Sequence, residues 1–485
     1  MNILFLMNGA PESFRLFKEL ACRFQNDGDK VVTAVDCLYS KDLNKLDSNS
    51  MEVRVFTDYW KNDENIHEEA AEKYKRDPIY STLLSDFERA DEFGFLRKRH
   101  RGFYDSLLSN LIGFFESIVK QENIDAIVYE NVSNGFANVA WMVANRCGVR
   151  YCGLYPSRLP GRFEIVDDPL RECEIYRGTF LKLRQHELMK SQSLLAWVED
   201  YLSNLDQTIP DYMFFTDFVG LKLFPKYFNF AKLKKYSFIL RRRYSDESRA
   251  FQVGNPVMLL VNLFFRSFKR RFRAKKCMSY FSEPNLSDRY FLYPLQYHPE
   301  SSTSVKAPSF INEYEIIRAI VFSLPYGTKL YIKDHPSMFA LQSVDFYQRL
   351  SLLPNTVLIA PSANTKSLIK SSMAVLTLTS TVGFEALLYG KKVLMFGSDS
   401  YEHHPNVVKV NDISLLHEIL VQELYSPTTV DRSITIDFIA SYYMCTYSGV
   451  INFFLSGEKT KTLAELVYPQ VRNFLLHGRS IDAYN

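Results

Sequence analysis

The sequence AVLTLTSTVGFEALLYGKKVLMFG, residues 374–397, decides the fold class of this chain. Two apolar runs, AVLTLT and KVLMFG, enclose the segment GFEALLYG, which suits a short helix. The first run passes into that helix through a turn rich in hydroxyl side chains. A buried strand, a turn, an apolar helix and a second buried strand are typical of a parallel sheet covered by helices. We therefore predict an α/β fold.

The same alternation of strands and helices runs back from this stretch to Tyr290. The apolar runs RYFLYPL, KLYIK and TVLIA predict strands, and the segments between them predict helices over 312–323, near Phe346 and near Thr365. This order predicts a doubly wound domain over residues 286–434, followed by terminal helices over 435–485. Ligands bind such a sheet at the carboxyl ends of its strands.

The first third of the chain repeats the pattern. Short apolar runs predict strands at 2–6, 31–35, 53–56 and 125–129. The last of them leads through a polar turn into the apolar segment NGFANVAWMVANRCGV and then into another run, YCGLYP. Strand, helix and strand in succession predict a second parallel sheet, so residues 1–165 form a Rossmann-like domain of their own. We expect the two domains to face each other across a cleft.

The region between these domains, residues 166–285, loses the alternation and is predicted to be a helical, basic and aromatic insertion or linker. Within it, residues 226–276 hold 15 Lys and Arg but only 2 Asp and Glu, interleaved with Tyr, Phe and Leu. This composition suits the surface of an anionic membrane. One alternative is a solvated helical face whose Lys and Arg stems cover apolar surface. Nucleic-acid binding is not expected, because no recognisable RNA or DNA module accompanies the basic stretch.

Length and composition set the broad class. A chain of 485 residues suggests roughly two to three domains. Hydrophobic residues make up 47% and aromatic residues 15%, which argues against a disordered chain. Seven cysteines without a CxxC pair indicate a reducing compartment. Because the first residues lack the features of a signal peptide and no apolar run reaches about twenty residues, we expect a cytoplasmic protein.

The segment IKDHP, residues 332–336, closes a predicted strand and opens a loop. It places the ammonium group of Lys333 and the imidazole of His335 where a parallel sheet receives its ligand, and these groups suit a phosphate. Pro336 leaves an alternative open, because proline is common at the first position of a helix and the motif can be a simple helix-starting turn.

The hydroxyl-rich turn inside 374–397 is the second motif. Thr379, Ser380 and Thr381 follow a strand and precede a helix, so their hydroxyl groups and the helix N–H groups can hold an anion together. Glu385 lies near the start of the same helix. Its carboxylate can belong to a capping box, or it can accept hydrogen bonds from a sugar or ribose hydroxyl.

The third motif, PLQYHPESST at residues 294–303, follows the first strand of the second domain. Its polar side chains include Gln296, His298, Glu300 and Ser301, and such density directly after a buried strand indicates a binding loop. The three loops leave different strands at one edge of the sheet. We therefore predict that they converge on a site for a nucleotide phosphate.

The first domain offers candidates for the chemistry and for a second substrate. Glu130 and Asn131 end a predicted strand at the expected cleft, and Asn8 follows the first strand. Glu130 can act as a general base toward an acceptor hydroxyl or as a nucleophile, and the alternative is a simple turn carboxylate. We place Asn8, Asn131 and Arg162 on the acceptor side, and His335 is the second catalytic candidate.

The segments PLQYHPESST, YIKDHPSM and LTSTVGFEALLYGKKVLMFG resemble those of bacterial capsule and surface-polysaccharide biosynthesis proteins, over about residues 289–407. The segment LPGRF, residues 159–163, is similar to the LPxR-like segment of that group. The resemblance implies a GT-B fold and a CMP-linked donor, either CMP-Kdo or a CMP-nonulosonate. It also implies donor contacts, with Lys333, His335 and Pro336 on the phosphate, Thr379, Ser380 and Thr381 on the phosphate or nucleotide, and Glu385 on a donor hydroxyl.

These observations predict a GT-B-like glycosyltransferase of capsule or lipopolysaccharide biosynthesis, which transfers Kdo or a nonulosonic acid from a CMP-sugar to a glycan acceptor. The acceptor can be lipid-linked, with the enzyme at the inner face of the cytoplasmic membrane. Lys333, His335 and backbone donors can stabilise the leaving phosphate, so neither a metal nor a cofactor is expected. The alternatives are a UDP- or GDP-sugar transferase, a sugar-nucleotide epimerase, or a non-catalytic assembly or export partner.

Overall fold

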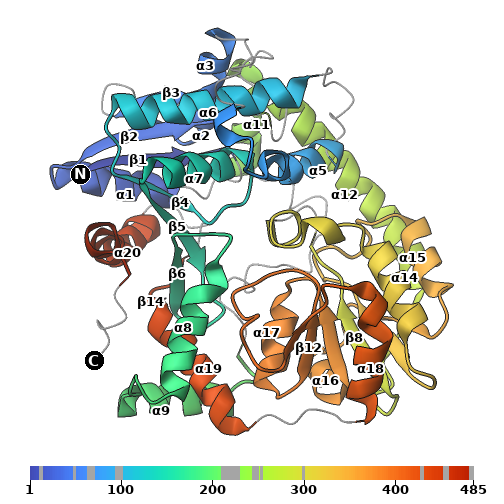
Figure 1. Cartoon of the computed structure of the whole chain (residues 1–485). Helices are drawn as coiled ribbons and strands as arrows, with labels where there is room; N and C mark the ends of the chain where they lie inside the picture. The colour runs from blue at the N-terminus through green and yellow to red at the C-terminus, as the bar shows by residue number, and fades with distance from the viewer. Residues whose placement is uncertain are drawn as a thin grey trace. The chain divides into compact units, whose positions relative to one another are not determined.

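The chain forms two compact α/β units in a computed structural model (Figure 1). The first unit combines Met1–Pro169, Tyr227–Phe264 and Thr446–Tyr484, and the second combines Leu170–Lys226 and Phe265–Cys445. The structure describes residues 1–9, 15–46, 51–62, 72–92, 102–208, 230–242, 251, 255–297, 301–425, 431–451 and 458–479.

The first unit is built on a sheet of seven strands in the order β14-β6-β5-β4-β1-β2-β3. The strands are β1 (Asn2–Met7), β2 (Lys30–Val35), β3 (Glu52–Val55), β4 (Ala126–Glu130), β5 (Arg150–Pro156), β6 (Arg162–Val166) and β14 (Tyr447–Ser448). The strands predicted from the first apolar runs are confirmed, and β1 to β5 are parallel. Strand β6 is antiparallel to β5, and β14 is antiparallel to β6.

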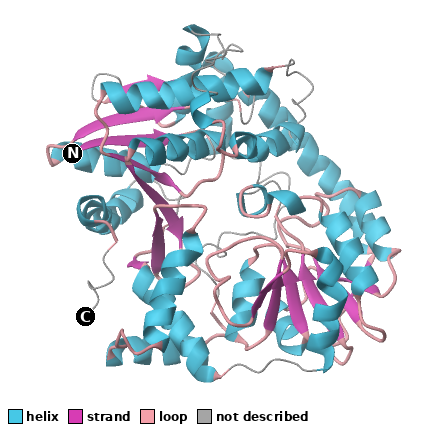
Figure 2. Cartoon of the chain, viewed as in Figure 1, coloured by secondary structure: helices cyan, strands magenta, loops and turns pink. Residues whose placement is uncertain are grey.

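Helices pack along the sheet of the first unit (Figure 2). They are α1 (Arg15–Asn26), α2 (Leu38–Leu43), α3 (Phe56–Asn62), the 3-10 helix η1 (Ile79–Leu83), α5 (Leu84–Glu92), α6 (Phe103–Gln121), α7 (Gly135–Cys147), α11 (Phe230–Arg242) and α20 (Glu458–His477). The local sequence sets the ends of α7. The Asn134 side chain accepts from the N–H of Ala137 at its start, and Gly148 follows its end with a φ of 69° that a side chain would disfavour.

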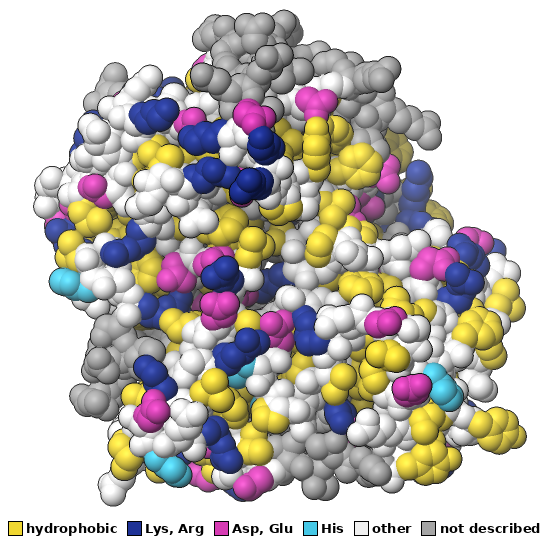
Figure 3. Space-filling model, in the orientation of Figure 1, with side chains coloured by type: hydrophobic (Ala, Val, Ile, Leu, Met, Phe, Trp, Pro, Cys, Tyr) yellow, Lys and Arg dark blue, Asp and Glu magenta, His cyan; other side chains and the backbone are white. Residues whose placement is uncertain are grey.

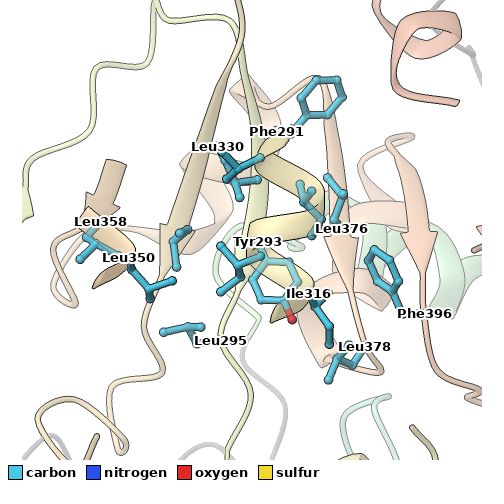
Figure 4. Close-up of a cluster of buried hydrophobic side chains, with 14 of the residues drawn as sticks. Phe291, Tyr293, Leu295, Ile316, Leu330, Leu350, Leu358, Leu376, Leu378 and Phe396 are labelled. Carbon is cyan, nitrogen blue, oxygen red and sulfur yellow. The ribbon is translucent and has the colours of Figure 1, made fainter. Parts of the chain in front are cut away.

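The second unit contains seven parallel strands in the order β13-β12-β11-β8-β9-β10-β7. They are β7 (Phe281–Ser282), β8 (Tyr290–Pro294), β9 (Lys329–Lys333), β10 (Thr356–Ile359), β11 (Ala374–Thr377), β12 (Lys392–Met395) and β13 (Val407–Lys409). Its core includes Phe291, Tyr293, Leu330 and Leu376 (Figure 4). The central strands are apolar along most of their length because helices cover both faces of a parallel sheet.

The second unit also contains helices, including those predicted between its strands. They are α8 (Glu172–Arg184), α9 (Gln192–Ser203), α13 (Ser301–Ser304), η6 (Pro308–Phe310), α14 (Glu313–Ser323), α15 (Val344–Ser351), α16 (Thr365–Ser371), α17 (Thr381–Leu388), η7 (Ile413–Leu415), α18 (Leu416–Tyr425) and α19 (Arg432–Cys445). The predicted helix 383–390 begins two residues earlier than expected, which makes Ser380 the residue that precedes the first turn.

The helices that the structure describes in region 166–285 divide between the two units. Helices α8 and α9 pack on α19 in the second unit, where the rings of Tyr176 and Tyr442 stack 4.2 Å apart. Helix α11 belongs to the first unit, and α12 (Pro256–Met278) begins there and ends in the second. The terminal helices divide likewise, with α19 in the second unit and α20 in the first. The unit to which each of these helices belongs is set by its packing contacts and not by its position in the sequence.

Figure 3 shows hydrophobic, basic and acidic side chains interspersed over the face that it displays. Among the helices in the described residues, none is long and apolar enough to cross a bilayer.

Candidate functional site

The chain order of the second sheet reverses at strand β8. Strands β9 and β10 lie on one side of β8, and β11 and β12 lie on the other. Open parallel sheets bind ligands at such a switch point, beyond the carboxyl ends of the strands. The loops that leave β8, β9 and β11 meet there, because the N–H of Leu295 donates to the carbonyl of Lys333 (2.9 Å) and Gln296 Nε2 donates to Thr377 Oγ1 (3.3 Å).

The loop after β8 is held by a buried carboxylate. Glu313, the first residue of α14, accepts hydrogen bonds through Oε1 from the N–H of Gln296 (3.0 Å) and from the hydroxyl of Tyr293 (3.2 Å). Gln296 itself is 5% exposed. The sequence analysis did not single out Glu313, because its role depends on a contact between a helix start and a strand end. His298 and Glu300 lie outside the described residues, and Ser301 begins the short helix α13.

The hydroxyl-rich turn is folded around Thr377. The Thr377 hydroxyl donates to Ser380 Oγ (2.8 Å) and accepts from the N–H of Ser380 (3.0 Å). Ser380 precedes the first turn of α17, yet its side chain does not cap the helix. The positive end of the helix dipole therefore meets the switch point without the serine cap that helix starts usually have, and this arrangement suits an anion.

Helix α17 also positions Glu385. Because Ser380 is the N-cap residue, the capping-box position falls on Gly383, and Glu385 lies two residues beyond it. Burial raises the pKa of Glu385 to about 7, and the nearby Lys366 opposes this shift. Gly383 is required for the packing of the helix, since a Cβ there would lie 2.6 Å from the hydroxyl of Tyr401.

Lys333 provides a buried cation at the end of β9. Its ammonium group donates to the carbonyl of Pro361 (2.7 Å), and the residue is only 4% exposed. Burial lowers the pKa of Lys333 to about 8, against the attraction of the neighbouring Asp334. A cation with this low pKa is poorly solvated, so an anionic ligand would stabilise its charged form.

The next two residues have distinct roles. Asp334 is buried and accepts a hydrogen bond from the Tyr347 hydroxyl (2.6 Å), and burial raises its pKa to about 7. His335 accepts the N–H of Ser337 at Nδ1 (3.2 Å), so the proton of the neutral ring lies on Nε2. Burial, and secondarily Lys333, lower the pKa of His335 to about 4. At neutral pH, His335 is therefore a neutral hydrogen-bond donor.

Helix α12 holds the loop that follows His335. The guanidinium of Arg270 is buried and donates to the carbonyl of Phe339 (2.7 Å) and to that of Pro336 (3.3 Å). Pro336 lies in a turn, where the N–H of Met338 donates to the carbonyl of His335 (2.8 Å). These hydrogen bonds join the basic helix α12 to the predicted phosphate loop.

The loop after β12 packs tightly against the same site. A Cβ at Gly397 would lie 2.6 Å from Thr379 Cγ2 and 2.8 Å from the Cβ of Ala307. Beside this contact, the ammonium of Lys306 lies 2.7 Å from a carboxylate oxygen of Glu172 and 3.7 Å from one of Asp399. The loops after β8, β11 and β12 thus form one packed group in which Thr379 is buried, and Thr381 is half-buried in the first turn of α17.

Replacing Gly397 by alanine is expected to weaken ligand binding at the switch point by about tenfold and to destabilise the second unit by about 1–3 kcal/mol. The added methyl group must push Thr379 away from the loop after β12. Gly178 in α8 offers a matched control, since nothing lies within 4 Å of a Cβ there. Gly178→Ala should leave binding unchanged, and nucleotide titration with thermal unfolding of both variants measures the difference. Equal behaviour of the two variants would contradict the proposed packing.

In the first unit, Glu130 is the last residue of β4. Its carboxylate accepts the hydroxyl of Ser133, and Asn134 Nδ2 donates to that same hydroxyl (3.1 Å). Burial raises the pKa of Glu130 to about 7, while the Ser133 hydrogen bond and Arg89 oppose the rise. A carboxyl group with a pKa near neutrality is suited to take up and release a proton. Glu130 and His335 belong to different units.

Other polar residues follow the neighbouring strands of the first sheet. Asn8 is buried after β1, and its carbonyl accepts Asn44 Nδ2 (3.1 Å). Asn131 is buried after β4, where its side chain accepts the N–H of Val132 (2.8 Å). Asp36 follows β2, is fully buried and has a pKa raised by that burial to about 6. The sequence analysis missed Asp36, although a carboxylate directly after the run VVTAV was a usable signal.

Arg162 lies at the same edge of this sheet, because β6 runs antiparallel to β5 and begins where β5 ends. It is the first residue of β6 and is 5% exposed. Its Nε donates to Thr446 Oγ1 (2.6 Å), and a terminal nitrogen donates to the carbonyl of Thr446. These contacts give its guanidinium a partner within the first unit, next to the edge strand β14.

The chain thus has the α/β fold predicted from its sequence, built on two sheets of mostly parallel strands. Residues 220–404 match a family model described as capsule polysaccharide biosynthesis protein, and this confirms the resemblance predicted from the motifs. The matched residues make up less than half of the chain and contain all three donor-side motifs.

Individual proteins resemble the chain more distantly. Protein FixF of Sinorhizobium fredii is 24% identical over 200 residues, which cover 40% of this chain and 45% of that protein. The chain therefore matches less than half of the length of this curated relative. A Thermosulfurimonas dismutans KpsC structure, described as a beta Kdo 2,7 transferase, is 13% identical with a TM-score of 0.31 and covers 68% of this chain and 80% of that one. A structure of S. aureus MnaA with UDP is 11% identical with a TM-score of 0.29, covering 99% and 98%.

Proposed function

We propose that the protein is a glycosyltransferase of bacterial capsule or lipopolysaccharide biosynthesis that transfers Kdo or a related nonulosonic acid from a CMP-sugar to a glycan acceptor. One observation carries this proposal. The buried cation Lys333, the neutral donor His335 and the uncapped start of α17 lie at or beyond the carboxyl ends of β9 and β11, the two strands that flank β8 at the switch point. All three are inside the segment that matches the capsule family model. The CMP-ulosonate donor is favoured by the resemblance of the three motifs.

The donor phosphate fits the chemistry of these groups. Lys333 supplies a positive charge, His335 donates through Nε2, and the first turn of α17 contributes the positive end of its dipole. When the bond between the sugar and the phosphate oxygen breaks, that oxygen takes the bonding electrons and CMP leaves. The three groups stabilise the developing charge, so the proposed reaction needs neither a metal nor another cofactor.

On the acceptor side, Glu130 is proposed to act as general base. The acceptor hydroxyl attacks the anomeric carbon of the donor sugar and gives its proton to the carboxylate. With a pKa of about 7, Glu130 is largely ionised just above neutrality and can still hold the proton that it receives. Asn8 and Asn131, which follow β1 and β4, are proposed to contact the acceptor with Glu130, and the acceptor is proposed to be carried on a membrane lipid.

The test is the release of free nucleotide from CMP-Kdo and a CMP-nonulosonate by the wild type and by His335→Ala, with UDP- and GDP-sugars in parallel. We expect CMP release by the wild type, and a loss of about tenfold or more in the variant because one hydrogen bond to the leaving phosphate is missing. His417→Ala is the matched control, since its ring contacts the carbonyl of Ser323 on the exposed surface.

Other outcomes separate the alternatives. Release from UDP- or GDP-sugars alone would reject the CMP-linked donor and keep the site. Interconversion of a sugar nucleotide without release would indicate an epimerase. Tight nucleotide binding without turnover, in the presence of acceptor glycans and unaffected by changes at Glu130, would indicate a non-catalytic assembly or export partner.

A further inference from the structure

Helix α12 exposes a stripe of large apolar side chains. Five of them recur at alternating intervals of three and four residues, and each is between 41% and 67% exposed: Met258, Val261, Phe265, Phe268 and Phe272. These intervals place side chains on one face of a helix. A helix of a globular protein normally turns such a face toward the core. In α12, the apolar face is turned outward instead.

The core of the second unit is packed by a different face of the same helix. Ala274 and Cys277 belong to the buried hydrophobic cluster of this unit, and Arg270 donates to the carbonyls of Pro336 and Phe339. The core of this unit therefore uses a different face of α12 from the one that carries the stripe. The stripe is an additional apolar surface on a helix that is already anchored by its other side.

Positive charge flanks the stripe. Lys269, Arg271, Lys275 and Lys276 are all exposed, and α12 contains no Asp or Glu. Apolar side chains on one face with Lys and Arg beside them are the pattern of helices that lie in the interface of an anionic bilayer. The apolar side chains enter the boundary between headgroups and acyl chains, and the basic ones meet the lipid phosphates.

We propose that α12 docks the protein onto an anionic phospholipid surface through a docking face made of Phe265, Phe268 and Phe272 with Lys269, Arg271, Lys275 and Lys276. Two copies of the protein would not pair through this face, because each would bring positive charge to the same surface. The phosphates of a bilayer supply the complementary charge. This face lies within residues 226–276, over which the sequence predicted membrane contact.

The docking face has a direct connection to the donor site. Arg270 lies on the buried side of α12 and donates hydrogen bonds to the turn after His335. The helix that carries the docking face is therefore in direct contact with the proposed phosphate loop. Membrane docking would therefore hold the donor-binding unit at the surface that presents a lipid-linked acceptor. This last step rests on the proposed function, whereas the binding of the docking face to lipid does not.

The experiment is flotation of the full-length protein with vesicles of phosphatidylcholine, with and without phosphatidylglycerol, in the absence of sugar nucleotide. We expect binding to the anionic vesicles only. Phe268→Glu/Phe272→Glu should lower the bound fraction by about tenfold or more, because two aromatic side chains no longer enter the bilayer. Lys269→Gln/Lys275→Gln should lower the affinity by about fivefold for each charge removed, and high salt should reduce wild-type binding in the same direction.

Matched variants lie on the same unit. Phe322 on α14 is 71% exposed and Lys182 on α8 is exposed, so Phe322→Glu and Lys182→Gln should bind vesicles as the wild type does. Unchanged melting temperatures of all variants would show that they fold.

Three results would overturn the proposal. In the first, the docking-face variants bind anionic vesicles as well as the wild type does. In the second, the wild type binds neutral and anionic vesicles equally. In the third, single-stranded DNA displaces the wild type from vesicles and the protein shows no preference for anionic lipid. Self-association without lipid that is lost in Phe268→Glu/Phe272→Glu would assign the face to a second copy. Release of CMP by the same variants with a soluble acceptor is measured separately, so a failure of docking and a failure of the proposed transferase activity are distinguishable.

Discussion

Replacing Glu130 by glutamine is expected to lower kcat by about 10²- to 10⁴-fold while leaving nucleotide binding unchanged. The amide keeps the size of the side chain but cannot accept the proton of the acceptor hydroxyl. The wild-type rate should rise with pH through about 7, where Glu130 loses its proton, and this rise should disappear in the variant. Initial rates of transfer across this pH range measure both effects.

Stability should change in the opposite direction. The folded pKa of Glu130 is raised above that of the unfolded chain, so its ionisation opposes folding. The cost develops as pH rises from about 4.3 to about 7 and is complete above that range, where it reaches about 3–4 kcal/mol. Glu130→Gln should therefore be more stable than the wild type at pH 8 and equal to it at pH 4, as measured by urea unfolding. Loss of activity with a loss of stability would instead indicate a turn carboxylate.

Ser133→Ala is the companion variant. The Ser133 hydroxyl donates to the ionised carboxylate and thereby lowers its pKa. Without that hydrogen bond, the rise of the rate should move to higher pH while the plateau remains within about tenfold of the wild type. An unshifted pH profile would mean that a group other than Glu130 controls the rate.

The sequence predicted the central strands because parallel strands covered on both faces are apolar along their length. Strands such as Lys329–Lys333 and Ala374–Thr377 therefore coincide with apolar runs. The antiparallel extension formed by Arg162–Val166 and Tyr447–Ser448 was not predicted. A two-residue strand has no periodicity, and its partner lies almost 300 positions away in the chain.

Some residues of the candidate site were likewise predictable from the sequence, and others were not. Residues at the carboxyl ends of strands or a few positions beyond them, such as Lys333 and Ser380, were predictable because parallel strands end at one edge of a sheet. Glu313, Arg270 and Gly397 were not, since each acts through a contact between distant segments. The neutrality of His335 was also beyond the sequence, because burial rather than residue type sets its pKa.

Replacing Lys333 by methionine is expected to weaken CMP binding by about ten- to a hundredfold. A charge-assisted hydrogen bond to phosphate contributes about 1.5–3 kcal/mol, and 1.4 kcal/mol corresponds to tenfold. The side chain is nearly isosteric, so the helix and strand contacts of β9 should persist. Removal of a poorly solvated charge stabilises the fold, whereas the carbonyl of Pro361 loses its donor, so we expect a small net change in stability.

The pH dependence of binding identifies the cation. Lys333 is charged below a pKa of about 8, so CMP affinity should be highest below that pH and fall as pH rises through it. Bound phosphate raises the pKa of the ammonium and moves this fall upward at saturating nucleotide. Lys333→Met should bind weakly at every pH and show no fall near 8. Isothermal titration calorimetry with CMP at several pH values measures these differences.

Lys329→Met is the matched control for Lys333→Met. Lys329 begins the strand that Lys333 ends, and its ammonium pairs with Asp288 (2.7 Å) at the opposite edge of the sheet, where it is 45% exposed. Its loss should leave CMP affinity and the pH profile unchanged. Equal CMP affinities for the wild type, Lys329→Met and Lys333→Met would mean that Lys333 only donates a structural hydrogen bond to the carbonyl of Pro361. The phosphate would then have to bind outside the switch point. A selective loss in Lys333→Met would place the negative charge of the donor at the end of β9, beside His335 and the start of α17.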